Sequence, residues 1–352
     1  MAVQIVTAFV NGMVCMLFWM FGFFLLKKKK DRLKKILGII LIVWGLILSK
    51  DIGYFFINPV ENRYLYRLLL ILDNCMVAAC GIFVLELLRP GNATIGKLLA
   101  HVSGFAVLTL LYGITGQEIF FQFNEGFTYL YCLVIFVWLV INTIRYNKMV
   151  KSLYSDLTLV DISWLWATVV LLLAVLFTWQ SLYIRLDFML DGIYYLLLAL
   201  VWSVIFFKTN KMIVPEKEDA ESVETSNNNE LRDERKYESL NMKLKELEEN
   251  GYFISSPQLT LKELANKIGT NRTYLSDFLN TEKKQSFYDY VNGIRLKHAE
   301  ELLRNGDRKL MLEEIALKSG FNSLSTFRRA FQKHYGISPA KYRTEPNNPS
   351  LK

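Results

Sequence analysis

The chain has 352 residues, of which 52% are hydrophobic and 21% charged, and its formal net charge at pH 7 is +8. These averages combine two unlike parts, because all seven Trp and all four Cys precede residue 203 and the later residues are strongly charged. The cysteines lie in apolar stretches, where buried reduced thiols are expected, and no Cys or His spacing is typical of a metal site. No metal or other cofactor is therefore predicted.

Seven apolar stretches of the first part have the composition expected of membrane spans, which take about 20 residues each. The predicted spans are 2–26, 36–58, 64–88, 98–116, 127–144, 161–182 and 192–207. None contains proline, whereas Pro59 and Pro90 fall in the gaps and Pro215 follows the last span. Residues 1–210 are thus predicted to form a seven-helix transmembrane bundle, a candidate sensor domain.

The gaps between the spans carry an uneven charge. The first, third and fifth gaps and the stretch after the last span hold 15 Lys and Arg, but the even-numbered gaps hold only Arg63 and Arg185. Because basic loops stay on the cytoplasmic side, the N-terminus is expected outside and the C-terminus inside. A cleaved signal peptide at 1–26 is disfavoured, because the basic cluster follows the apolar run instead of preceding it.

Four charged residues within or beside the predicted spans form a candidate signal site. They are Lys50, Asp51, Arg67 and Asp73. Charged groups in a membrane are unfavourable and usually face the bundle interior. One interpretation is a polar network that fixes helix packing, and the other is a site for an outside ligand or ion; the spacing names no ligand.

The junction between the two parts is acidic and polar. Residues 211–236 are predicted to be a flexible linker, since 215–230 almost lack large apolar side chains. Leu240, Leu244 and Leu247 then recur at helical spacing and predict an amphipathic helix. This helix is expected to be the first of the soluble domain, although a short dimer-forming helix is the alternative, so a second copy of the chain is a candidate partner.

The soluble part begins with a predicted helix-turn-helix unit. Thr260 and Glu263 have the spacing of a capping box, and Gly269 ends the first helix. Asn271 is expected to cap the second helix. The side chains that this helix is predicted to expose are Arg272, Thr273, Ser276 and Asp277.

A second unit of the same kind follows about 50 residues later. Gly320 provides its turn, and Asn322 or Ser323 is expected to cap the helix after it. Phe327, Ala330 and Phe331 mark the buried side of that helix. Its predicted exposed side carries Ser325, Arg328, Arg329, Gln332 and Lys333.

Two such units joined by one long helix suit double-stranded DNA. A rigid connection can place two recognition helices one DNA turn apart, about 34 Å. From residue 256 onward the chain has 17 Lys and Arg against 10 Asp and Glu, so this region is basic. Arginines can pair with phosphates or guanine edges, and Ser, Thr and Gln with other base edges.

Residues 237–343 resemble the AraC-type DNA-binding domain. The resemblance rests on four motifs: L-x-x-L-A-x-x-x-G-x-N-R-T-Y-L-S from Leu261, Y-x-N-x-x-R-x-x-x-A-x-x-L-L from Tyr290, E-I-A-x-x-x-G-F-N-S-x-S-T-F-x-R-A-F from Glu314, and G-x-S-P-x-x-Y-R ending at Arg343. It implies a soluble seven-helix domain over 237–345, followed by a tail at 346–352, and it implies binding to promoter DNA. By motif position it makes eight side chains groove-facing: Arg272, Thr273, Ser276, Asp277, Leu324, Ser325, Arg328 and Arg329.

The leading hypothesis is an all-α, membrane-bound transcription regulator of a bacterial cell membrane, with its DNA-binding domain in the cytoplasm. A transporter or membrane enzyme with an attached DNA-binding domain is the alternative, and a passive membrane anchor is a third. Catalysis in the soluble part is not expected, because it lacks a phosphate-binding Gly loop, an H-E-x-x-H motif and a nucleophile with a His partner.

Overall fold

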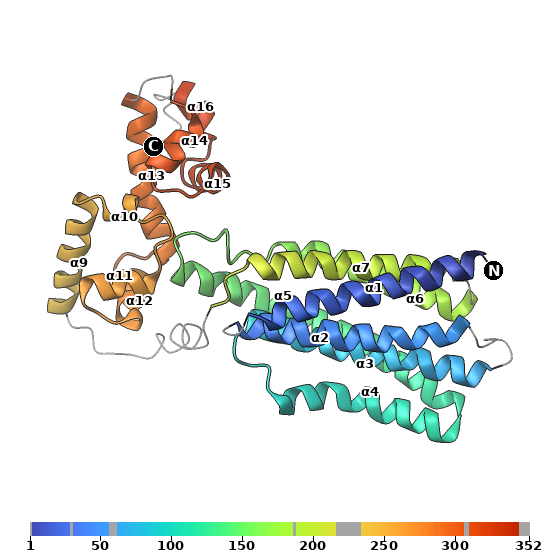
Figure 1. The fold of residues 1–352 in the computed structure, drawn as a ribbon. Coiled ribbons are helices and arrows are strands. Elements are labelled where there is room, and N and C mark those ends of the chain that lie inside the picture. The colour runs from blue at the N-terminus through green and yellow to red at the C-terminus, as the bar shows by residue number, and fades with distance from the viewer. Residues whose placement is uncertain are drawn as a thin grey trace. The chain divides into compact units, whose positions relative to one another are not determined.

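The computed structural model describes residues 2–28, 31–55, 62–185, 188–215, 234–305 and 310–344, and these form helices with one isolated β-bridge (Figure 1). The all-α prediction is therefore confirmed. The chain divides into two compact units, one of Met1–Ile144 with Asp161–Glu216 and one of Arg145–Val160 with Lys217–Lys352. Most of the predicted linker (216–233), the tail 346–352 and the end of the second predicted span (56–58) lie outside the described residues.

The first unit contains the apolar helices. Their bounds are α1 Ala2–Leu26, α2 Arg32–Ser49, the 3₁₀ helix η1 Lys50–Phe55, α3 Arg63–Leu88, α4 Ile95–Thr115, α5 Glu118–Leu153, α6 Trp164–Arg185 and α7 Phe188–Lys211. Among the described residues, six helices are long and apolar enough to cross a membrane, with α2 counted through Gly53. The predicted span 161–182 corresponds to α6, whose shorter apolar part is Trp164–Trp179.

Two helices differ from the predicted spans for local reasons. The helix α2 gives way to 3₁₀ geometry at Lys50, where the charged pair Lys50–Asp51 interrupts the apolar run. The helix α5 extends beyond the predicted 127–144 at both ends, because helix geometry needs no apolar composition and no proline stops it. Its last residues, from Arg145, belong to the second unit.

The helices α1 and α2 approach each other closely at two glycines. A Cβ atom at Gly22 would lie 2.8 Å from the carbonyl oxygen of Gly38, and one at Gly38 would lie 2.9 Å from that of Gly22. Small residues at facing positions allow such backbone contact, a common device between apolar helices in membranes. The helix α7 packs on the same pair through Trp202, whose ring lies edge-on to Trp44 at 4.9 Å.

The second unit contains a series of short helices. Their bounds are α9 Glu234–Glu249, α10 Tyr252–Ser255, α11 Leu261–Ile268, α12 Arg272–Thr281, α13 Phe287–Asn305, α14 Leu312–Lys318, α15 Leu324–Tyr335 and α16 Pro339–Thr344. The predicted amphipathic helix is α9, in which Leu240 and Leu244 are buried. The buried residues Ala299, Ile315, Phe321, Phe327 and Phe331 form one core cluster that joins α13, α14 and α15.

Local signals shape both helix-turn-helix units as predicted. Thr260 and Glu263 form the capping box of α11, and Asn271 accepts a hydrogen bond from the amide of Tyr274 at the start of α12. Ser323 caps α15 by accepting from the Thr326 amide. Gly320 has φ of +83°, and a Cβ there would lie 2.7 Å from the Ile254 carbonyl oxygen, so this turn requires glycine.

Arg295 on α13 is buried at 1% exposure and acts as a hub of hydrogen bonds. Its guanidinium donates to the carbonyl oxygens of Phe253, Ser256 and Pro257 at 2.7–3.2 Å. It also donates to the side chain of Asn292 at 3.2 Å. One cation thereby holds the chain that leads from α10 into α11 against α13.

Gly22→Ala is expected to lower the thermal stability of the detergent-solubilised protein. The added methyl group has to separate two backbones in contact, and overpacking of this kind destabilises by about 1–3 kcal/mol. Thermal unfolding followed by tryptophan fluorescence measures the change. The matched control is Gly12→Ala on the same helix, where a Cβ has no atom within 4 Å. Equal effects of the two substitutions would contradict the close contact.

Arg295→Lys is expected to destabilise the second unit by about 2–4 kcal/mol, because an ammonium group cannot satisfy the same set of buried carbonyl oxygens. Urea unfolding followed by circular dichroism checks this. The control is Lys297→Ala on the same helix, whose side chain is 71% exposed. An Arg295→Lys protein as stable as the parent would show that the network is not needed for stability.

Candidate functional site

The exposed face of α15 is the first part of the candidate site. Ser325, Arg328, Arg329, Gln332 and Lys333 are all exposed, while Phe327, Ala330 and Phe331 are buried on the opposite side. The helix therefore presents two arginines together with hydroxyl and amide groups, the side chains that contact phosphates and base edges in a major groove. Exposure along this face is as predicted, and the contacts with DNA stay predictions.

Lys333 differs from its neighbours because it has an acidic partner. Its ammonium group lies 2.8 Å from the carboxylate of Asp289 at the start of α13. Partial burial acts to raise the pKa of Asp289, but hydrogen bonds from Lys333 and Ser286 hold that pKa below its ordinary value. The carboxylate stays ionised, so Lys333 is paired with a negative charge beside the basic face of α15.

The second helix of the first helix-turn-helix unit, α12, is less exposed than predicted. Arg272, Thr273 and Asp277 are half-buried, and the prediction that Ser276 is exposed is wrong, because its residue is 5% exposed. Ser276 lies on the buried side of α12 with Leu275 and Leu279, and its hydroxyl accepts a 3.4 Å hydrogen bond from Asn280. At 3.6 residues per turn, Ser276 is adjacent to Leu275 and Leu279 on the surface of the helix. This spacing is the signal in the sequence that indicates its burial.

Two more residues that are predicted to contact DNA, Asp277 and Leu324, contact other residues of the same domain. Asp277 accepts a 2.6 Å hydrogen bond from the hydroxyl of Tyr237 on α9. Leu324 packs partly buried against the core cluster of α13, α14 and α15. Sequence reasoning missed Tyr237 and Asp289 as partners, because nothing local relates them to residues about 40 positions away.

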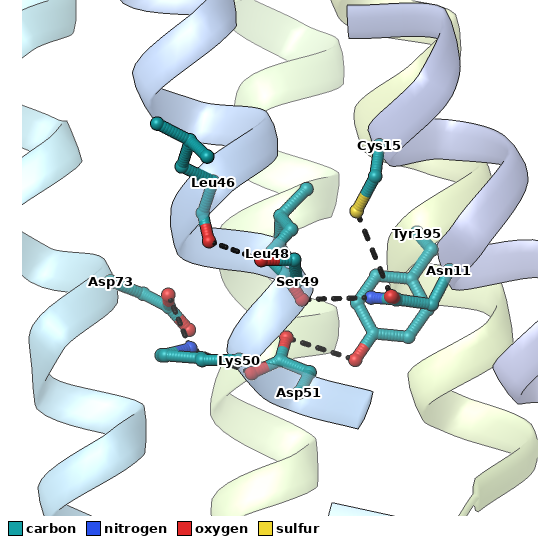
Figure 2. Close-up of polar contacts among 9 residues, drawn as sticks. All are labelled: Asn11, Cys15, Leu46, Leu48, Ser49, Lys50, Asp51, Asp73 and Tyr195. Atoms are coloured by element: carbon teal, nitrogen blue, oxygen red, sulfur yellow. Dashed lines mark hydrogen bonds and ion pairs between the residues drawn. The ribbon is translucent and has the colours of Figure 1, made fainter. Parts of the chain in front are cut away.

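The second part of the candidate site is a charged cluster in the first unit, shown in Figure 2. The Lys50 ammonium lies 2.6 Å from Asp51 and 2.8 Å from Asp73 on α3. Tyr195 on α7 donates a 3.0 Å hydrogen bond to the other oxygen of Asp51. Both carboxylate side chains are less than 10% exposed and the Lys50 side chain is half-buried, so α3, α7 and the end of α2 meet around one cation between two anions.

Arg67 lies in a different pair from the other three candidates. It forms an ion pair with Glu118 at the start of α5, and its guanidinium lies 5.1 Å from the centre of the Phe121 ring. The structure thus brings Lys50, Asp51 and Asp73 together and joins Arg67 to α5. Glu118 and Tyr195 were missed, since they lie 51 and 144 residues along the chain from their partners.

Further buried polar groups line the same unit. Asn74, next to Asp73, donates to Asn124 on α5 at 2.7 Å, and Asn124 donates to Thr109 on α4 at 3.2 Å. Asn11 on α1 donates to the carbonyl oxygen of Leu48 at 3.2 Å, close to where α2 ends (Figure 2). Hydrogen-bonded side chains therefore tie α3 to α5, α5 to α4 and α1 to α2.

A family model described as a helix-turn-helix domain matches residues 264–345. The chain is 32% identical over 90 residues to the Msm operon regulatory protein of Streptococcus mutans and covers 32% of that relative. It is 33% identical over 91 residues to the probable transcription factor PqrA of Proteus vulgaris and covers 73% of it. It is 31% identical over 85 residues to the melibiose operon regulatory protein of Escherichia coli K12 and covers 28% of it.

These matches cover 24–26% of the chain itself, and it spans about a third or less of the length of two of the three relatives. No solved structure matches the chain significantly. The matched residues contain most of α11 and all of α12–α16, the elements that build both helix-turn-helix units. Through this C-terminal domain the chain belongs to the AraC-type family of DNA-binding transcription regulators.

Proposed function

We propose that this regulator is bound to a bacterial cell membrane by its apolar helices and couples a signal received there to promoter binding. The proposal rests on one observation: within its described residues, the same chain holds six long apolar helices and two capped helix-turn-helix units. Helices this apolar suit lipid, because a span must satisfy its backbone internally and present apolar side chains outward.

The charge pattern of the loops supports a cytoplasmic DNA-binding unit. The predicted gap 145–160, which belongs to the second unit, is one of the basic gaps and contains Arg145, Lys148 and Lys151. On this topology α15 and α12 face the compartment that holds the chromosome. The regulator then acts on promoter DNA that comes to the membrane.

The buried cluster of Lys50, Asp51 and Asp73 is the proposed signal site. Its charges sit where three helices meet, so a change in its protonation or ion binding alters the packing of α2, α3 and α7 together. Charged residues inside apolar helices mark such functional positions more often than they add stability.

Replacing Arg328 and Arg329 together with Ala is expected to weaken promoter binding about 30-fold or more, since each groove contact contributes about 1–3 kcal/mol. DNA fragments that the protein occupies in a genome-wide binding map serve as probes. Titration of these fragments with the purified full-length chain gives the Kd.

The control for this pair is Lys245→Ala with Lys297→Ala, which removes the same charge from exposed positions on α9 and α13. A loss of affinity common to both double variants would mean that net charge, and not α15, accounts for binding.

A second experiment separates a sensing role of the charged cluster from a packing role. Lys50→Met leaves two buried carboxylates without their cation and is expected to destabilise the protein by about 3–5 kcal/mol. The triple variant Lys50→Met, Asp51→Asn, Asp73→Asn removes all three charges and is expected to fold yet to lose regulation of its target promoters.

Reporter expression from those promoters, measured over the growth conditions in which the parent chain switches, reads out the response. A folded triple variant that regulates as the parent does would assign the cluster to packing alone. Regulation by a freed 231–352 fragment equal to that by the whole chain would instead reduce the apolar helices to an anchor.

A further inference from the structure

The chain between α5 and α6 packs on the helix-turn-helix domain. Residues 154–160, here called the docking segment, belong to the same compact unit as that domain. Tyr154 forms an antiparallel bridge with Thr260, the residue that caps α11. The segment therefore meets the first helix-turn-helix unit at the N-terminal end of its first helix.

Ser155 anchors the docking segment and is 1% exposed. Its amide and its hydroxyl both donate to the carbonyl oxygen of Leu259, at 3.1 and 2.7 Å. Asn292 on α13 donates to the carbonyl oxygen of Ser155 at 2.9 Å, and Arg295 to its hydroxyl at 3.4 Å. A contact this buried and this fully hydrogen-bonded is specific, because each group would lose a partner on release.

The next residues reach the second helix-turn-helix unit. Asp156 accepts a 2.6 Å hydrogen bond from the side chain of Asn322, just before α15 begins. The hydroxyls of Thr158 and Thr326 lie 3.3 Å apart, and Thr326 is in the first turn of α15. The docking segment thus spans from the start of α11 to the start of α15.

The start of α15 is also where DNA is expected to bind. The N-terminal residues of a recognition helix approach the groove, and helix N-termini with Ser, Thr and Asn side chains contact phosphates. The positive end of the helix dipole favours an anion there. Asp156 brings a carboxylate to this place, where a DNA phosphate would bring its own negative charge.

We propose that the docking segment is an internal ligand of the DNA-binding domain, which occupies the start of α15 and has to leave before promoter DNA binds. The inference rests on the proposed role of α15 as a DNA-reading helix. The carboxylate of Asp156 and the hydroxyl of Thr158 stand in for phosphate oxygens. DNA and the segment are then alternative occupants of one surface.

Because the docking segment is joined to α5 and α6, movements of these helices can affect the competition between the segment and DNA. The docking segment directly follows α5 and precedes α6, so a displacement of either helix along its axis pulls on Tyr154 or Val160. Val160 is held in turn, because its carbonyl oxygen accepts a 3.0 Å hydrogen bond from Tyr146 on α5. The contact can therefore transmit a signal that the linker at 211–236, expected to be flexible, cannot.

A disulfide between Tyr154→Cys and Thr260→Cys tests the competition in the full-length protein with its four native cysteines changed to Ala. Residues opposite each other in an antiparallel bridge have Cβ atoms about 4.5–5.5 Å apart, near the range for a disulfide. The oxidised protein is expected to bind promoter fragments at least about ten-fold more weakly than the same protein after reduction.

Equal affinities before and after reduction would overturn the proposal, and so would failure of the disulfide to form under oxidant. As a second variant, Asp156→Ala is expected to tighten DNA binding on the order of three- to ten-fold by weakening the docked state. Its control is Asp161→Ala, which removes the same charge from a similar turn outside the segment, where Asp161 accepts from the Ser163 amide at 3.0 Å.

The arginine variants of α15 separate this inference from the function it rests on. Suppose that Arg328→Ala with Arg329→Ala weakens DNA binding while the disulfide has no effect. The DNA-binding role of α15 is then supported, and the proposal that the docking segment competes with DNA is rejected. If the arginine changes leave affinity intact, the role of α15 itself is wrong.

Discussion

The guanidinium of Arg295 is the interaction on which the DNA-binding unit depends. A buried cation is tolerated only where its donors are satisfied, and here the acceptors come from the α10–α11 connection, from α13 and from Ser155 of the docking segment. Burial lowers the pKa of Arg295 to about 10, an effect that the charge of Asp156 opposes. The group remains charged at neutral pH, so it holds the α10–α11 connection against α13, and in the docked state it also holds the docking segment.

Features with a local cause could be predicted from the sequence. Capping at Thr260, Asn271 and Ser323, the turn at Gly320 and the buried stripe of α15 each depend on neighbours within a few positions, and each was confirmed. The burial of Ser276 and the bond between Asp277 and Tyr237 depend on how helices pack, which a single sequence does not reveal. The docking segment was missed for the same reason, since Ser155 and Leu259 lie 104 residues apart.

The two units use buried polarity in opposite ways. In the helix-turn-helix unit, the buried Arg295 is satisfied mainly by neutral carbonyl and side-chain oxygens. In the apolar unit, Lys50 lies between Asp51 and Asp73, so one positive charge faces two negative ones. The first arrangement holds one geometry, whereas the second carries an excess of acidic groups that a proton or cation could balance. This contrast favours the proposed division into a DNA-reading unit and a responsive one.

The contact between Gly22 and Gly38 limits how the apolar unit can move. Two backbones this close leave no room for an acyl chain or a small molecule between α1 and α2, and sliding would drive larger side chains into the gap. The pair must therefore shift as one rigid body. Asn11 of α1 is bonded beside the end of α2, and Lys50 and Asp51 follow directly, so these two members of the charged cluster travel with that body. Any rearrangement must then occur where this pair of helices contacts α3 and α7. These are the helices that contribute Asp73 and Tyr195.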